Sequence, residues 1–205
     1  MWLIIGGILW GHVTMAAADA APDAAPPGRT DTATFAGGCF WCMQPPYDQL
    51  PGVVSTTVGY TGGTKAHPTY EEVSSGETGH AEAVHIVYDP SKITYAQLLD
   101  VFWQNIDPTT RNQQFADHGS QYRTAIFYHG DEQRQLAEAS KQRWAASGKF
   151  GGRPLVTEIV PASTFYPAEA SHQQYYQTCP LQYKAYRAGS GREGFLRKLW
   201  GRSNH

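Results

Sequence analysis

The sequence predicts an α+β fold, a two-layer α/β sandwich with a mixed sheet and a ferredoxin-like core. Along the chain, two kinds of segment alternate. One kind has the apolar–polar alternation or the many β-branched residues of a strand, and the other has apolar residues at helical spacing. Several connections are short and the expected strands are half-polar, whereas a doubly wound parallel sheet needs long crossovers and strands that are apolar throughout. No internal repeat is visible.

The first expected strand is Thr32–Ala36 (TATFA), which alternates and is ended by Gly37-Gly38. A turn or helix start follows. Pro45-Pro46 fit only the first turn of a helix, because proline lacks the N–H that the helix interior requires. A regular helix is therefore expected from Met43 or Gln44 to Leu50.

The middle of the chain continues the alternation of elements. Thr94–Asn105 has apolar residues at helical spacing with Thr94 as N-cap, and Asp131–Ser147 is a second helix that Gly148 caps. Asp107–Tyr122 is polar and broken by Gly and Pro, which predicts a long loop of the kind that often carries function. Further strands are expected at Val53–Tyr60, Ala81–Tyr88, Arg123–Tyr128 and Leu155–Val160.

Composition and charge limit the possible functions. The 205 residues, with 41% hydrophobic content, suit one globular domain, expected over residues 31–200. From Phe165 onward the sequence is aromatic, polar and Gly-broken, and only Glu193–Trp200 is expected to be helical there. The net charge is −2 and no long basic run occurs, so nucleic acid is not an expected partner.

Residues 1–30 differ from the rest and are expected to be a signal peptide with a Pro/Ala-rich linker. Met1–Trp10 is apolar but too short to span a bilayer, and A-x-A sites such as Ala16-Ala17-Ala18 follow it. This predicts export to the periplasm. No Lys or Arg precedes the apolar run. A cytoplasmic protein with an N-terminal extension, or a form tethered to the membrane by this segment, therefore remains an alternative.

The chain has three cysteines, Cys39, Cys42 and Cys179, and the first two form a C-x-x-C pair. An odd count is a poor framework for structural disulfides. A c-type haem motif needs His after the second cysteine, where Met43 stands, and no second ligand pair has the spacing of a zinc site. Redox chemistry is the interpretation that this spacing favours.

Cys39 is the candidate nucleophile. A thiol at a helix start meets oriented N–H groups and the positive end of the helix dipole, which lower its pKa. Phe40 and Trp41 place aromatic surface beside the sulfur. The pattern predicts a thiol nucleophile next to an aromatic wall, and a buried structural cysteine is the alternative.

Further short motifs follow Gly38–Cys42 (GCFWC) in a fixed order. They are Gly59–Gly63, Pro68-Thr69-Tyr70, Gly79–Val84, Val87–Pro90, Phe102-Trp103, Asp117–Arg123 and Tyr183–Arg192. Each piece alone is weak, but all of them in this order are very specific. From about Thr34 to Arg192 the chain resembles the peptide methionine sulfoxide reductases of the A type.

The resemblance implies thiol-dependent reduction of methionine-S-sulfoxide, free or in oxidised proteins, and hence a protein-repair enzyme. Cys39 would attack the sulfoxide sulfur and become a sulfenic acid. Glu82 would protonate or hydrogen-bond the oxygen, and a carboxyl group in an aromatic pocket has the raised pKa that suits this task. No cofactor or metal is implied, and a monomer is expected.

The resemblance also implies roles for side chains around the two reacting groups. Tyr70 and Tyr122 would donate hydrogen bonds to the sulfoxide oxygen. Phe40 and Trp41 would hold the substrate methyl group, and Asp117 would orient the site through water or Tyr122. Without the motifs, these residues would be interpreted as ordinary half-buried or solvated side chains. His80 and His85 are expected to be structural.

The sulfenic acid must be resolved by a second thiol. Cys42 is close enough in sequence to form a disulfide with Cys39 and is favoured, while Cys179 is the alternative. The reductant would be thioredoxin or, after export, a thioredoxin-like donor. Two rival interpretations are a thioredoxin-like disulfide oxidoreductase, which shares C-x-x-C, and a non-enzymatic binding module with an aromatic pocket.

Overall fold

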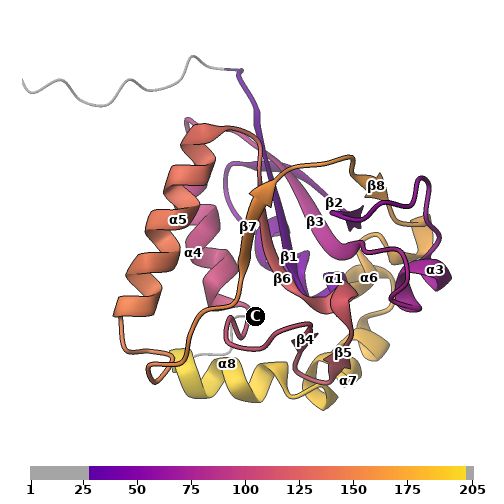
Figure 1. The fold of residues 1–205 in the computed structure, drawn as a ribbon. Coiled ribbons are helices and arrows are strands. Elements are labelled where there is room, and N and C mark those ends of the chain that lie inside the picture. The colour runs from indigo at the N-terminus through magenta and orange to yellow at the C-terminus, as the bar shows by residue number, and fades with distance from the viewer. Residues whose placement is uncertain (1–27, 202–205) are drawn as a thin grey trace, which may run out of the picture.

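The computed structural model describes residues 28–201 and has a six-stranded sheet in the order β7-β6-β1-β3-β2-β8 at its centre (Figure 1). The strands of this sheet are β1 (Asp31–Gly37), β2 (Val53–Thr61), β3 (Ala81–Tyr88), β6 (Thr124–Tyr128), β7 (Glu158–Pro161) and β8 (Tyr166–Pro167). The expected signal peptide and linker lie, up to residue 27, outside the described residues. Within residues 28–201, no helix has the length and apolar character needed to cross a membrane.

The remaining elements are short or flank the sheet. The α-helices are α1 (Phe40–Met43), α2 (Pro45–Asp48), α3 (Tyr70–Ser74), α4 (Tyr95–Gln104), α5 (Asp131–Ala146), α6 (Tyr175–Thr178), α7 (Pro180–Gly189) and α8 (Arg192–Trp200). Two 3₁₀ helices, η1 (Ser120–Tyr122) and η2 (Ala170–His172), and a small hairpin of β4 (Gln113–Gln114) and β5 (Asp117–His118) complete the described chain.

The middle of the sheet confirms the ferredoxin-like core. The four strands β6, β1, β3 and β2 are adjacent and antiparallel. In chain order they form a β-α-β-β-α-β unit in which α1 and α2 make the first crossover and α4 makes the second. β7 pairs in parallel with β6, so the complete sheet is mixed as expected, and β8 adds an antiparallel edge next to β2.

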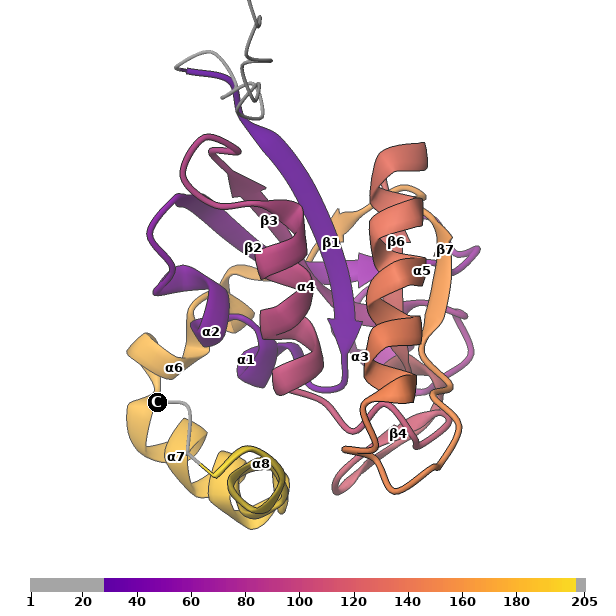
Figure 2. The ribbon, with the colours of Figure 1, turned by 90° about the vertical axis from the view of Figure 1, so that its left-hand side faces the viewer.

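The main hydrophobic core lies between the sheet and the helices α2, α4 and α5 (Figure 2). Phe35 of β1 meets Tyr47 of α2 and Phe102 of α4 at ring-centroid distances of 5.8 and 5.3 Å. α4 has the predicted bounds within one residue, and Thr94 caps it in a reciprocal capping box with Gln97. This packing fixes β1, and with it the position of the residues that follow β1.

Three predicted elements differ from the structure. The helix expected from Met43 or Gln44 to Leu50 is wrong, because α1 already starts at Phe40 and Pro45-Pro46 open a separate helix, α2. The strand expected from Leu155 begins only at Glu158, where pairing with β6 starts. The C-terminal part contains α6 and the ten-residue α7 besides the expected last helix. Tertiary contacts rather than local patterns determine these boundaries.

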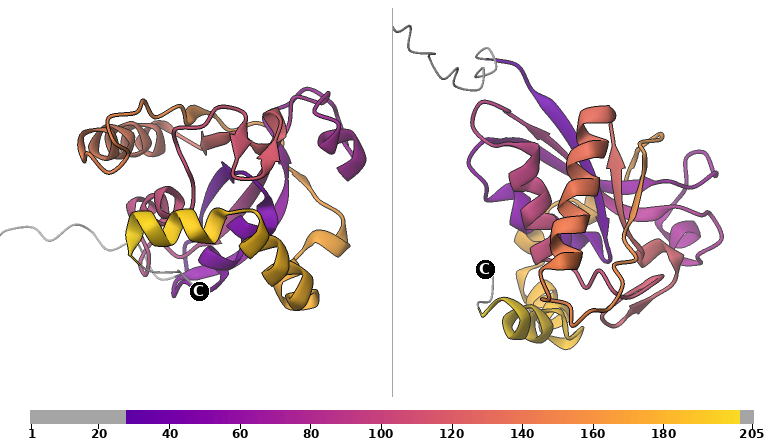
Figure 3. Two further views of the ribbon diagram at one scale, coloured as in Figure 1. Left: turned by 90° about the horizontal axis from the view of Figure 1, so that it is seen from below. Right: turned by 60° about the vertical axis from the view of Figure 1, so that its left-hand side comes forward.

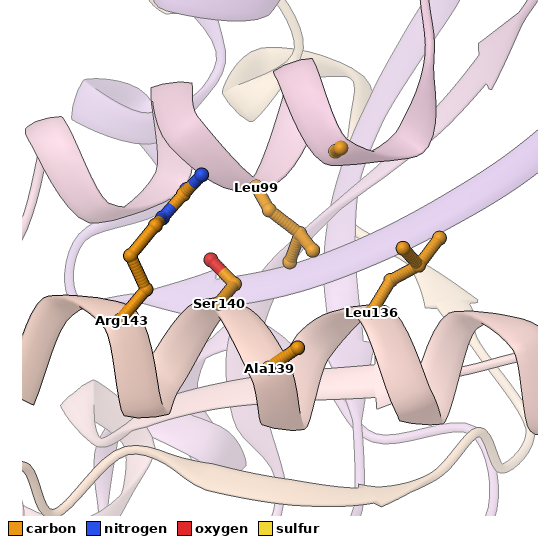
Figure 4. Close-up of a pocket in the computed structure, with 6 residues that line it drawn as sticks. Leu99, Leu136, Ala139, Ser140 and Arg143 are labelled. Atoms are coloured by element: carbon orange, nitrogen blue, oxygen red, sulfur yellow. The ribbon is translucent and has the colours of Figure 1, made fainter.

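The C-terminal helices lie together at one end of the sheet. Seen from below, α7 and α8 run across that end, beneath the place where β1 stops and α1 begins (Figure 3). On the helical side, a pocket of about 160 Å³ lies between α4 and α5 (Figure 4). Its walls include Leu99, Leu136 and Arg143 and contain none of the predicted site residues. The predicted nucleophile, Cys39, lies instead just after the end of β1.

Candidate active site

Cys39 stands at the end of β1 in a turn that only glycine can make. Gly38 has a φ of +81°, a left-handed conformation that disfavours other residues. A side chain at Gly38 would also collide with Gln114, whose Cβ would lie 2.5 Å from the added carbon. Cys39 is the N-cap of α1 and only 6% exposed, and its carbonyl accepts a 3.0 Å hydrogen bond from the N–H of Cys42.

Glu82 is fully enclosed on β3, directly beside this turn. Its Oε2 accepts a 2.9 Å hydrogen bond from the backbone N–H of Phe40, the residue after Cys39. Burial raises the pKa of Glu82 to about 8; the Phe40 N–H opposes this rise, and the charge of Asp117 adds to it. The carboxyl group therefore carries a proton at neutral pH and can donate it.

Tyr70 and Tyr122 come from separate parts of the chain and meet at the same place. Tyr70 is the first residue of α3, which a capping box between Thr69 and Glu72 fixes, and Tyr122 ends η1. Burial is the main cause that raises the pKa of each phenol, so both hydroxyls are donors at neutral pH. The charges of Glu82, Cys39 and Asp117 act on both, so the predicted set gathers around one point.

The aromatic residues after Cys39 have different surroundings. Phe40 is buried, and its ring centroid lies 5.9 Å from that of Tyr60. Trp41 is half-buried and stacks on Tyr175 of α6 at 4.0 Å, and its Nε1 donates to Nδ1 of His172 at 3.2 Å. Phe40 thus packs against the sheet, whereas Trp41 packs against the C-terminal segment.

The thiols of Cys39 and Cys42 act on each other. Both are buried and free, and each shifts the pKa of the other. Burial raises the pKa of Cys39, and Cys39 lowers the pKa of Cys42. The expectation that the helix start lowers the pKa of Cys39 is therefore wrong, because α1 is a single turn and the sulfur is removed from water. Cys179 is half-exposed and lies against Tyr175.

Asp117 has a partner that the sequence analysis did not single out. Its Oδ2 accepts a hydrogen bond from the hydroxyl of Tyr186 on α7, and the same hydroxyl contacts the thiol of Cys39. Tyr186 therefore links Asp117 to the nucleophile, and the charge of Asp117 also acts on Tyr122, so the expected role through water or Tyr122 stays a prediction. Tyr186 lies inside the Tyr183–Arg192 motif, so its position in that motif was the only available signal.

Glu169 is a second residue that sequence reasoning missed. Its two carboxylate oxygens accept hydrogen bonds from the Tyr60 hydroxyl and from the backbone N–H of Tyr70, each at 2.9 Å. The neighbouring His172 stacks on the Tyr70 ring at 4.3 Å. The segment after β8 thereby holds Tyr70 in place, although nothing in its sequence pattern predicts this.

The two histidines judged structural are held by hydrogen bonds within the fold. His80 accepts from the N–H of Gly63 at its Nδ1 and donates from its Nε2 to the carbonyl of Lys65, which fixes one tautomer. His85 pairs with the Thr34 hydroxyl at 3.0 Å, on the sheet face opposite Phe35. In residues 28–201, no group of three or more His, Cys, Asp or Glu side chains is arranged to hold a metal ion.

Comparison with known proteins agrees with this geometry. The sequence profile of the family described as peptide methionine sulfoxide reductase matches residues 31–204. The chain belongs to this family. The reductase is 56% identical over 173 residues to the peptide methionine sulfoxide reductase MsrA of Bacillus subtilis, a match that covers 84% of this chain and 97% of the relative. It is 52% identical to the enzyme of Listeria innocua, over 83% of this chain and 96% of the relative.

Solved structures support the same fold. The methionine sulfoxide reductase A of Corynebacterium diphtheriae superimposes with a TM-score of 0.71 and 37% identity, over 77% of this reductase and 78% of that chain. The reduced form of Mxr1 from Saccharomyces cerevisiae gives a TM-score of 0.70 and 34% identity, over 76% and 88%. The reductase is therefore a thiol oxidoreductase acting on methionine sulfoxide, and not one of the two rival classes, a thioredoxin-like oxidoreductase or a binding module.

Proposed function

We propose that the chain reduces methionine-S-sulfoxide in oxidised proteins, or as the free amino acid, with Cys39 as nucleophile and Glu82 as acid. The observation that carries this assignment is the buried carboxyl group of Glu82, which is protonated at neutral pH and hydrogen-bonded to the residue after Cys39. An acid and a nucleophile on adjacent elements can act on the oxygen and the sulfur of one sulfoxide group.

In the first half of the reaction, Cys39 Sγ attacks the sulfoxide sulfur while Glu82 gives its proton to the oxygen. Methionine leaves, and the oxygen stays on Cys39 as a sulfenic acid. The proton of Cys39 passes to Cys42, the buried neighbouring thiol whose pKa Cys39 lowers. Tyr70 and Tyr122 donate hydrogen bonds to the oxygen as charge develops on it. Phe40 and Trp41 supply the apolar surface for the methyl group.

In the second half, Cys42 resolves the sulfenic acid. Glu82, which the first half left as a carboxylate, takes the proton that Cys42 received from Cys39. The Cys42 thiolate then attacks Cys39 Sγ, the S–S bond forms, and the S–O bond breaks as Glu82 returns the proton and the hydroxyl group leaves as water. Cys42 is favoured over Cys179 because Cys39 and Cys42 shift each other's pKa, whereas Cys179 lies against Tyr175. A thioredoxin-type dithiol then reduces the disulfide. In support, Mxr1 of Saccharomyces cerevisiae, 27% identical with a TM-score of 0.51, has been crystallised in complex with Trx2.

Three serine substitutions test this cycle. The Cys39→Ser variant is expected to form no methionine from a methionine-S-sulfoxide peptide. The Cys42→Ser variant is expected to form one equivalent per enzyme and then to stop when thioredoxin is the donor, because the sulfenic acid is no longer resolved. Methionine is quantified by mass spectrometry in single and multiple turnover.

The Cys179→Ser variant is the matched control and should turn over with thioredoxin like the unchanged protein. A peptide with the opposite sulfur epimer should not be reduced. Normal thioredoxin-dependent turnover of Cys42→Ser, together with loss of turnover in Cys179→Ser, would reassign the resolving thiol. Methionine formation by Cys39→Ser would reject the nucleophile itself.

A further inference from the structure

Arg192 is a buried cation whose hydrogen bonds all go to uncharged groups. It begins α8, and only 1% of its surface is exposed. Its Nη1 donates to the carbonyl of Asn105 at 2.6 Å and its Nη2 to the carbonyl of Gly37 at 2.9 Å. Its guanidinium carbon lies 4.6 Å from the centre of the Phe115 ring. No carboxylate in the described part of the chain forms an ion pair with it.

A buried guanidinium without a carboxylate is costly, because neither water nor an opposite charge offsets its desolvation. The contacts of Arg192 show which part of the chain its positive charge can stabilise. Its Nη2 bonds to Gly37, just before Cys39, and its Nη1 lies 3.6 Å from Sδ of Met43, just after Cys42. The cation therefore contacts both ends of the segment that carries the two thiols.

The turn before Cys39 is shaped around this side chain. A Cβ added to Gly38 would lie 2.9 Å from Arg192 Nη2, so the glycine leaves room for the guanidinium as well as for the left-handed turn. The positive charge of Arg192 also acts on Cys42 and helps to lower the pKa of that thiol, after the effect of Cys39. Arg187 of α7 lowers this pKa as well, by less than Arg192, whereas burial and the charge of Asp117 raise it. The contacts of Arg192 and its positive charge therefore both act on the segment that carries Cys39 and Cys42.

We propose that Arg192 is a positioning residue for the thiol pair: it holds the Gly37–Met43 segment in place and supplies the charge that stabilises Cys42 as a thiolate. The inference rests on the proposed role of Cys42 in resolution. The step that benefits is the attack of the Cys42 thiolate on Cys39 Sγ, which forms the S–S bond and breaks the S–O bond. The first half also needs this thiolate, because Cys42 takes the proton of Cys39 when Cys39 attacks the sulfoxide, so a weaker charge at Arg192 moves the pH profile of both steps.

The test follows disulfide formation after one turnover. The full-length protein is mixed with one equivalent of a methionine-S-sulfoxide peptide at pH values from 6 to 9.5, chosen as roughly the range in which thiols titrate. Remaining sulfenic acid is trapped with dimedone, and the disulfide is mapped by mass spectrometry. In Arg192→Gln, the pH profile of disulfide formation is expected to move up by about one unit from its midpoint at about pH 7, so that resolution at pH 7 is about 5-fold slower.

Lys198→Gln is the matched control, because it removes an exposed positive charge from the same helix. Its pH profile should be unchanged. Arg192→Lys keeps the charge but loses the forked hydrogen bonds, so it should slow resolution at every pH without moving the profile. If Arg192→Gln does not fold, slower resolution in Arg192→Lys with methionine formation unchanged supports the positioning role, and equal slowing of both halves rejects it.

Two results would overturn the inference, and they are distinguishable. A Cys39–Cys42 disulfide whose pH profile is the same in Arg192→Gln and the unchanged protein would reject the role of Arg192 alone. A Cys39–Cys179 disulfide would reject the proposed resolving thiol and the role of Arg192 with it. A purely structural role would lower the midpoint of thermal unfolding and slow both halves of the reaction equally, with no shift of the profile, which would also reject it.

Discussion

The active site has two halves that are built differently. The strand half consists of Cys39, Cys42 and Glu82 at the ends of β1 and β3, next to the main hydrophobic core. The C-terminal half consists of Glu169, Tyr186 and Arg192, on a segment in which α6 has no buried residue and α7 has only Tyr183. The first half carries the reacting groups, and the second adjusts them by hydrogen bonds and charge.

This difference follows from what each task requires. A nucleophile and an acid need fixed relative positions, which a paired and densely packed sheet provides. The proton affinity of a group depends on the charges and hydrogen bonds around it, and these can come from any segment that reaches it. Substitutions in the strand half should therefore affect the reaction most, and those in the C-terminal half should have graded effects.

The largest effect is expected from Glu82→Gln, which removes the acid while nearly keeping its shape. Methionine formation in single turnover should fall by about 10²- to 10⁴-fold, the usual contribution of a positioned general acid. In the unchanged protein, the rate should fall as the pH rises through about 8, because Glu82 then loses its proton. The variant should lack this descending limb.

The raised pKa of Glu82 also makes the stability of the protein depend on pH. The direction is opposite to that of a carboxylate in an ordinary ion pair. Folding raises the pKa of Glu82, so its contribution to stability is complete below the usual carboxyl pKa and is lost as the pH rises through about 8. Denaturant unfolding of the protein and of Glu82→Gln at pH 5 and pH 9 measures this. Equal pH dependence in both would contradict a protonated Glu82, and Glu138→Gln on the exposed side of α5 is the control.

A smaller effect is expected from Tyr186→Phe, which breaks the link between Asp117 and Cys39. Losing one hydrogen bond to a charged group costs about 1.5 kcal/mol, which corresponds to about a 10-fold slower first turnover. Tyr176→Phe is a matched control, because Tyr176 also donates to a carboxylate, that of Asp48. Equal rates for both variants would show that Tyr186 only packs against the site.

The smallest effect is expected from Glu169→Gln. The amide oxygen can still accept from the Tyr70 N–H while the amide NH2 donates to the Tyr60 hydroxyl, so both contacts survive and only the negative charge is lost. Because the side chain is 44% exposed, the loss should be about 2-fold, seen as a higher KM for the peptide with kcat nearly constant. A fall in kcat as large as that of Glu82→Gln would erase the distinction between the two halves.

The strand half could be predicted from local patterns for physical reasons. Gly37-Gly38 must end β1, and the alternation in Ala81–Tyr88 gives β3 with the bounds observed. Motif resemblance then selected Glu82 and Tyr70, whose side chains meet at the end of β1. In the C-terminal half, the Tyr183–Arg192 motif contained Tyr186 and Arg192 but indicated no role for either, because α6 and α7 are held by individual aromatic and polar contacts such as Trp41 on Tyr175.

The sequence by itself determined the ferredoxin-like core, the family, and the residues able to act as nucleophile and acid, since hydrophobic periodicity and ordered motifs are local properties of the chain. Only the tertiary structure decided the protonation of those residues. The pKa values of Cys39, Cys42 and Glu82 depend on burial and on partners such as Tyr186 and Arg192, which lie more than a hundred residues away along the chain. Such values arise from distances in space, which no local pattern contains.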